Sequence, residues 1–135
     1  MLFKRAQITS YGNELTQRGA AGLGEVSNLS VKTIATDANA VLTVADLSGG
    51  VVQFTGFTAG RTITVPTAAL ILAAAPDMDI GDSFSLTISV VPAFAGTYVT
   101  AAGVTLAGRA TVPAASSTYV VVTKTSATTV TWTAL

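Results

Sequence analysis

The chain has 135 residues, a length that fits one compact domain. Seven Lys and Arg balance seven Asp and Glu, and only 10% of the residues are charged, so bulk electrostatic binding to nucleic acid or to an anionic membrane is not expected. Cys and His are both absent, which excludes disulfides, thiol nucleophiles, Cys/His zinc sites and the Ser-His-Asp triad. We therefore expect neither an enzyme nor a cofactor, and the low charge favours packing against copies of the chain or a larger assembly.

Residues 1–36 are predicted to form an extended N-terminal arm, because their apolar residues follow neither a period of 2 nor one of 3.6. Gly19, Gly22 and Gly24 are interpreted as a flexible hinge in this arm, since no strand precedes them and no phosphate-binding Gly-Lys-Ser/Thr follows. The start of the chain lacks the apolar stretch of a secretory signal, and no apolar run reaches the roughly 20 residues that span a bilayer. A soluble protein without an export signal is expected.

Residues 37–135 are predicted to form one all-β domain, because Thr and Val are dense and turn residues recur at intervals near ten residues. This pattern is typical of a β-sandwich or jelly roll of about eight short strands. The expected strands cover residues 41–45, 51–55, 61–65, 83–90, 97–100, 104–106, 109–112, 119–124 and 128–133.

Three segments of this domain support more specific predictions. Residues 83–90 alternate strictly between apolar and polar side chains. The apolar ones, Phe84, Leu86, Ile88 and Val90, lie on one face, and Ser and Thr lie on the other. The continuous apolar run 119–122 predicts a strand buried on both faces. Residues 68–75 favour one short helix with Thr67 as its N-cap, ended by Pro76, which would cover the sheet as a plug or lid.

Two groups of side chains could carry chemistry. Asp77, Asp79 and Asp82 could bind calcium or act as paired carboxylates, but their place between a helix end and a strand start favours an ordinary turn. Trp132 is interpreted as a core or interface residue rather than a sugar platform. No catalytic, metal or cofactor-binding residue is predicted.

Four segments resemble the small decoration and head-fibre proteins of tailed bacteriophages. They are Asp46–Gly50, Gly60–Ala68, Ile80–Phe84 and Thr100–Gly108. The resemblance lies in the general character of these segments and in their order along the chain, and it extends over about two thirds of the chain. It implies a non-enzymatic virion protein, commonly a homotrimer, that binds the outer surface of the major capsid protein on the mature capsid. Such families have no active-site residues to carry over.

The N-terminal arm is predicted to be a principal capsid contact, because its apolar side chains lie outside the β pattern and need a partner surface. The predicted contact residues are Phe3, Arg5, Ile8, Tyr11 and Leu15. Two alternatives stay open. The arm could cross to a neighbouring subunit and serve only the oligomer, or the chain could be a carbohydrate- or host-binding fibre or tail module that stacks sugars on Tyr98, Tyr119 or Trp132.

Overall fold

The computed structural model describes residues 29–135 as a mainly β protein, with 46% strand and 10% helix. Two short helices interrupt the strands: α3 (Val44–Leu47) and α4 (Ala68–Ala74). The strands are β1 (Ser30–Ile34), β2 (Ala40–Val41), β3 (Gly50–Phe54), β4 (Arg61–Thr64), β5 (Ser83–Val90), β6 (Gly96–Val99), β7 (Val104–Gly108), β8 (Thr111–Val112), β9 (Ser116–Lys124) and β10 (Val130–Ala134).

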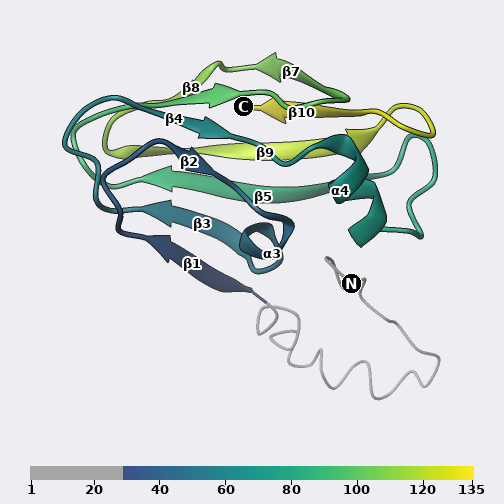
Figure 1. Cartoon of the computed structure of the whole chain (residues 1–135), viewed down its shortest axis with the longest axis horizontal. Coiled ribbons are helices and arrows are strands. Elements are labelled where there is room, and N and C mark those ends of the chain that lie inside the picture. Colours follow the sequence, from purple (N-terminus) through teal and green to yellow (C-terminus); the bar gives the residue numbers. More distant parts are fainter. Residues whose placement is uncertain (1–28) are drawn as a thin grey trace.

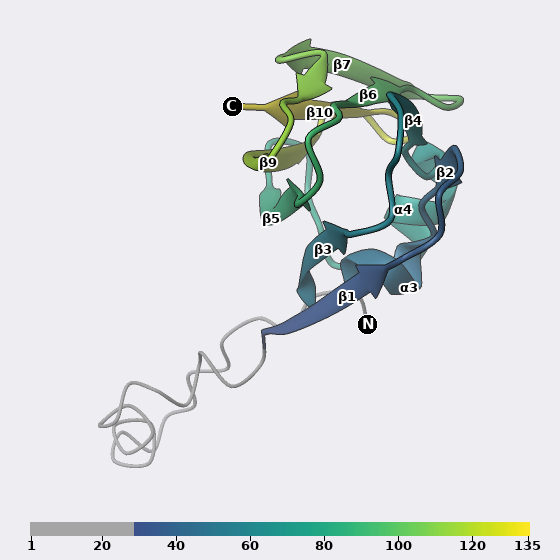
Figure 2. The same cartoon turned by 90° about the vertical axis from the view of Figure 1, so that its left-hand side faces the viewer.

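The strands form two sheets. One has six strands in the order β1-β3-β5-β9-β10-β7, and the other has four in the order β2-β4-β6-β8. Figure 1 shows the six-stranded sheet spread out strand by strand, and Figure 2 shows the strands of both sheets arranged around a common interior. That interior holds one cluster of buried side chains from both sheets and both helices.

From β1 to β6 the chain alternates between the two sheets. Each strand from β3 to β6 therefore pairs with the strand that lies two places earlier in the sequence. The pairs β1–β3, β3–β5, β2–β4 and β4–β6 are therefore parallel. Jelly rolls are antiparallel architectures. The predicted mainly β class is confirmed, but this half of the molecule is wound as successive coils, which the spacing of turns did not indicate.

The predicted strand over residues 83–90 is confirmed as β5, and its alternation matches the structure. Leu86, Ile88 and Val90 are buried, whereas Ser83 and Ser85 are exposed. The prediction that residues 119–122 are buried on both faces is wrong, because Tyr119 is 50% exposed. β9 lies in the middle of the six-stranded sheet, and the second sheet covers only one face of it.

The helix predicted over residues 68–75 is confirmed as α4, with the Thr67 hydroxyl accepting a hydrogen bond from the Leu70 amide at 3.3 Å. The predicted strand over residues 41–45 is wrong beyond Val41. Thr43 instead caps α3 in a capping box: its hydroxyl accepts from the Asp46 amide, and the Asp46 carboxylate accepts from the Thr43 amide. This reciprocal pair satisfies two helix-terminal donors and overrides the β preference of Val44.

The N-terminal arm was predicted to extend to residue 36, but its last part belongs to the fold. β1 pairs along its whole length with β3, and the Ser30 amide donates to the Gly49 carbonyl at 2.9 Å. Four of its five residues are nevertheless exposed, so β1 is held by backbone hydrogen bonds more than by core packing. A strand with so few buried side chains gives no hydrophobic period, which is why the sequence did not reveal it.

Neither helix within residues 29–135 has the length and apolar character needed to cross a membrane.

Candidate functional site

The larger of the two sheets, with six strands, has one side that faces away from the buried core. The residues of this side follow from the strand register, since every second side chain points away from the buried core. We call this surface the outer sheet face, and it comprises Val31, Thr33, Val51, Gln53, Ser83, Ser85, Thr87, Ser89, Ser117, Tyr119, Val121, Thr123, Thr131, Thr133, Thr105 and Ala107. Every one of these residues is uncharged, and none is buried.

A row of two valines, a threonine and a tyrosine crosses this face at right angles to the strands. Val31, Val51, Thr87 and Tyr119 are cross-strand neighbours on β1, β3, β5 and β9. The Leu135 amide donates to the Tyr119 carbonyl at 2.8 Å, which places the 60% exposed Leu135 beside the row. Tyr119 combines a large exposed ring with a hydroxyl, a side-chain type that often dominates the energy of protein interfaces.

Hydroxyl groups occupy much of the rest of the outer sheet face. Ser83 and Thr123 lie opposite each other on β5 and β9, with their hydroxyl oxygens 2.7 Å apart. Thr131 and Thr105 continue the same row onto β10 and β7. A partner can therefore cover this face without removing any charged group from water, which is the costly part of burying a polar surface.

The charged side chains on the strands of this sheet lie elsewhere. Lys32 shares the inward-facing side of β1 with Ile34, and its ammonium group lies 3.7 Å from the Asp46 carboxylate of α3. Lys124 ends β9 and donates to the Met78 carbonyl at 2.9 Å. The lack of charge on the outer sheet face is thus a property of that face and not of the strands as a whole.

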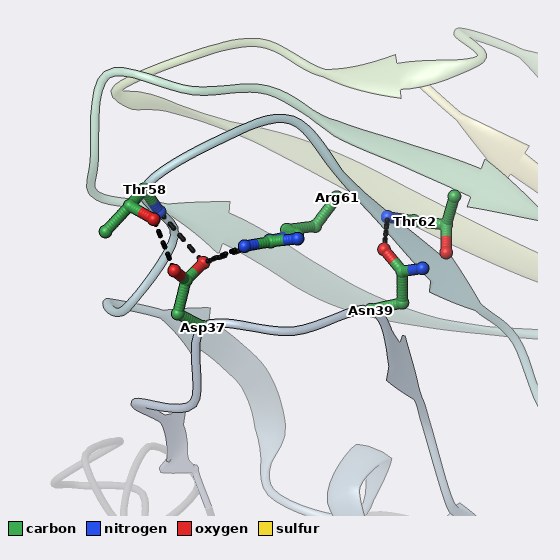
Figure 3. Close-up of polar contacts among 5 residues, drawn as sticks. All are labelled: Asp37, Asn39, Thr58, Arg61 and Thr62. Carbon is green, nitrogen blue, oxygen red and sulfur yellow. Dashed lines mark hydrogen bonds and ion pairs between the residues drawn. The ribbon is translucent and has the colours of Figure 1, made fainter.

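A polar cluster ties two loops together at one end of the sheets (Figure 3). Asp37 follows β1 and accepts hydrogen bonds from the amide and the hydroxyl of Thr58, which lies between β3 and β4. The Arg61 guanidinium lies 2.8 Å from the same carboxylate, and the nearby Asn39 side chain accepts from the Thr62 amide at 3.0 Å.

The hydrogen bonds set the charge state of this cluster. Those from the Thr58 hydroxyl and amide, together with Arg61, lower the pKa of Asp37 to about 2 against the opposing effect of burial. The carboxylate therefore stays charged in mild acid, where an ordinary Asp would begin to take up a proton, and its oxygens are occupied by its neighbours. A carboxylate held in this way fastens two successive coils of the chain to each other, and we assign it that structural role.

The acidic residues that follow α4 form the turn expected from the sequence. The Asp79 amide donates to the Asp82 carboxylate at 2.9 Å, and the Asp82 amide donates to the Asp79 carbonyl at 2.9 Å. Gly81 occupies the left-handed region with φ of +101°, and its amide donates to the Lys124 carbonyl at 2.8 Å. Within residues 29–135, no three acidic side chains come together in a group suited to a metal ion.

The aromatic residues considered as sugar platforms are mostly inaccessible. Trp132 is fully buried and Tyr98 is 5% exposed, and their rings meet edge to face with centroids 6.0 Å apart. Burial raises the pKa of Tyr98 to about 12, against weaker opposite effects of Thr118 and Trp132. Only Tyr119 of the three is free to meet a partner, so the interpretation of Trp132 as a core residue is confirmed.

The predicted capsid-contact residues Phe3, Arg5, Ile8, Tyr11 and Leu15 lie outside the described residues, and so does the glycine hinge. Sequence reasoning did not identify the outer sheet face as a site. A signal for it was present in the polar half of the alternation over residues 83–90, where Ser and Thr stand at every second position without one charge. The neighbouring strands could not be joined to this pattern without knowledge of the strand order.

Comparison of the chain with protein-family models, with curated proteins and with solved structures found no match in any of the three.

Proposed function

We propose that the protein is a non-enzymatic structural protein that decorates the outer surface of a bacteriophage capsid and braces contacts between major capsid protein subunits. The observation that carries this proposal is the outer sheet face, which spans six strands without a charged residue. Soluble proteins commonly place charges on exposed sheet faces, and their absence over such an area suits permanent contact with another protein. The sequence resemblance to decoration and head-fibre proteins points in the same direction.

The way the two sheets pack together is also part of the proposed function. The two sheets share one core, and we infer that they act as a rigid sandwich that presents the outer sheet face to its partner. Such a body loses little conformational entropy on binding, because its contact residues are already ordered on strands. The predicted arm, with Phe3, Arg5, Ile8, Tyr11 and Leu15, would add contact area beside this body, and the homotrimer implied by the resemblance remains part of the proposal.

The alternative of a carbohydrate- or host-binding fibre module receives less support. Sugar-binding surfaces rely on exposed aromatic rings, and burial of Tyr98 and Trp132 leaves Tyr119 as the single exposed ring of the three candidates.

A binding experiment with capsids tests the proposal directly. Expanded capsids would be assembled from the major capsid protein encoded in the same genome, mixed with the purified chain and imaged by electron cryomicroscopy. We expect additional density at repeated positions on the outer capsid surface. Bare capsids at saturating protein concentration would contradict the proposal, as would a glycan array on which the chain binds a defined sugar while capsids stay bare.

A further inference from the structure

Within residues 29–135, the two sheets end in four edge strands: β1 and β7 in the six-stranded sheet, and β2 and β8 in the four-stranded sheet. An edge strand presents unpaired N–H and C=O groups that can pair with another chain. Proteins usually suppress such pairing with very short edges, with charged side chains, especially Lys, or with proline. The four edges of this fold differ sharply in this respect.

Three of the edges carry such a feature. β2 and β8 are only two residues long, so they offer very few backbone N–H and C=O groups for pairing with another strand. β1 has Lys32 at its centre. β7 is five residues long and contains neither a charge nor a proline. Figures 1 and 2 both place β7 at the rim of the fold, with no other labelled element beyond it.

The hydrogen bonds of β7 to β10 show which of its backbone groups face this rim. The Gly103 carbonyl accepts from the Val130 amide at 3.1 Å, and the Arg109 amide donates to the Ala134 carbonyl at 2.7 Å. Because successive peptide groups of a strand point to opposite sides, residues 103, 105, 107 and 109 face β10. The N–H and C=O groups of Leu106 and Gly108, and the C=O of Val104, therefore point away from the sheet.

We propose that β7 pairs antiparallel with β7 of a second copy of the chain, across a two-fold axis at Leu106. The Leu106 amide then donates to the carbonyl of Leu106 of the partner subunit, and the partner subunit's Leu106 donates in return. On either side of this pair, the Gly108 amide of one subunit donates to the Val104 carbonyl of the other, while the Val104 amide keeps its bond to the Ala101 carbonyl at 3.1 Å. An isologous contact of this kind requires a self-complementary surface, and this register provides one.

The side chains also fit this register. Thr105 lies opposite Ala107 of the partner subunit in a non-hydrogen-bonded pair, with Cα atoms about 4.5 Å apart. Both residues are small and uncharged, so no like charges meet. Gly108, with φ of +79°, ends the strand before the first nearby charge, Arg109. The pairing joins two six-stranded sheets into one continuous sheet.

The contact is small, with few hydrogen bonds and little apolar area, so we expect it to depend on concentration. It does not rest on the proposed function, and it is independent of any three-fold contact, which would use other surfaces. The measurable consequence is a lower mass for a variant whose β7 edge is blocked: half the wild-type mass where β7 pairing is the only contact between copies, or where it closes two trimers into one hexamer.

Sedimentation over a range of concentrations tests the register with two double variants. Thr105→Lys with Ala107→Lys places two Lys–Lys pairs across the axis, and we expect it to halve the mass of the wild-type species. Thr105→Glu with Ala107→Lys places two Glu–Lys pairs there instead, and we expect it to retain the wild-type mass. Both variants change outward-facing residues, and thermal unfolding would verify that each remains folded.

A matched control adds the same charge at the opposite edge of the sheet. Val31→Lys with Thr33→Lys on β1 changes two exposed residues, and we expect no change in mass. The proposal is overturned if the wild type stays monomeric up to millimolar concentration, or if the Lys–Lys variant has the same mass as the wild type. It is equally overturned if the β1 variant, and not the β7 variant, halves the mass.

Discussion

The two faces of β5, β9 and β10 are made by the same strands but have opposite compositions. The inner face holds Leu86, Ile88, Val120, Val122 and Trp132, all of which are buried. The outer face of the same strands holds hydroxyl side chains, Val121 and Tyr119, with no charge. Successive side chains of a strand point to opposite faces. Inward-facing residues therefore stabilise the fold, and outward-facing residues are available for contacts with a partner.

This contrast predicts that substitutions on the two faces have separate effects. Changes on the inner face should lower the free energy of unfolding and affect binding only through folding. Changes on the outer face should leave stability nearly unaltered and act on capsid binding. The following variants test this separation in order of decreasing effect on stability.

Trp132→Ala should have the largest effect on stability. Trp132 is the largest fully buried side chain and contacts the Tyr98 ring, so its removal leaves a cavity in the core. We expect the free energy of unfolding to fall by about 3–5 kcal/mol in urea titrations. Thr133→Ala, one residue away on the outer face, is the matched control and should change stability by less than about 0.5 kcal/mol. Equal losses from the two variants would refute the separation of faces.

Tyr98→Phe should have an intermediate effect. The Tyr98 hydroxyl lies 2.5 Å from the Thr118 hydroxyl, and Thr118 is 1% exposed, so the variant leaves a buried hydroxyl without this partner. We expect a loss of about 1–3 kcal/mol by thermal or urea unfolding. Adding Thr118→Val removes the unpaired hydroxyl and should restore part of the loss, and a double variant less stable than Tyr98→Phe would contradict this explanation.

The same tyrosine predicts a dependence on alkaline pH. Its pKa is raised from 10.0 to about 12 in the folded state, so the folded protein retains the phenol proton more tightly than the unfolded chain. The resulting stability is present below pH 10 and is lost as the pH rises from 10 towards 12. Melting temperatures measured across this range should fall less steeply in Tyr98→Phe than in the wild type, and identical slopes would argue against the effect.

Asp37→Asn should have a smaller effect that depends on acid pH. The folded-state pKa of Asp37 is lowered from 3.8 to about 2, so its contribution is present above pH 3.8 and is lost as the pH falls towards 2. The variant should be less stable than the wild type at pH 7, and the difference should shrink at pH 2. Asp77→Asn, at an exposed position in the turn after α4, provides a control. A difference between wild type and Asp37→Asn that stays constant with pH would contradict this assignment.

The sequence predicted those elements whose causes are local. The alternation of residues 83–90 indicated β5, and Thr67 followed by Ala-rich residues indicated α4. Local reasoning failed at Val44, where the capping box of Thr43 and Asp46 forms a helix turn inside a β-favouring segment. It also missed β1, which depends on pairing with β3, a partner some 20 residues away in the chain.

The outer sheet face could not be predicted for the same reason. Thr87 and Tyr119 are more than 30 positions apart in the sequence, yet they are cross-strand neighbours in the sheet. Alternation can assign each residue to one side of its own strand, but the order of strands decides which residues form one surface. The parallel coils of β1 to β6 are a further consequence of long-range pairing that turn spacing does not encode.

The arm prediction can be tested separately from the body. A deletion of residues 2–18 removes Phe3, Arg5, Ile8, Tyr11 and Leu15. If the arm is a principal capsid contact, the truncated chain should keep its β circular dichroism and oligomer mass but lose capsid occupancy. Unchanged decoration by the truncated chain would show that the arm is not the anchor, and loss of oligomer mass would show that it serves neighbouring subunits.

The most direct test of the outer sheet face compares two variants that add the same charge. Thr87→Lys with Thr133→Lys places two cations on the face beside Tyr119, whereas Ala59→Lys with Ala127→Lys places two cations on exposed loops outside the sheets. Capsid occupancy would be measured by electron cryomicroscopy alongside melting temperature. We expect both variants to melt like the wild type, the loop variant to decorate capsids fully, and the face variant to lose at least about tenfold in occupancy. Wild-type occupancy of the face variant would contradict the assignment of this surface as the contact.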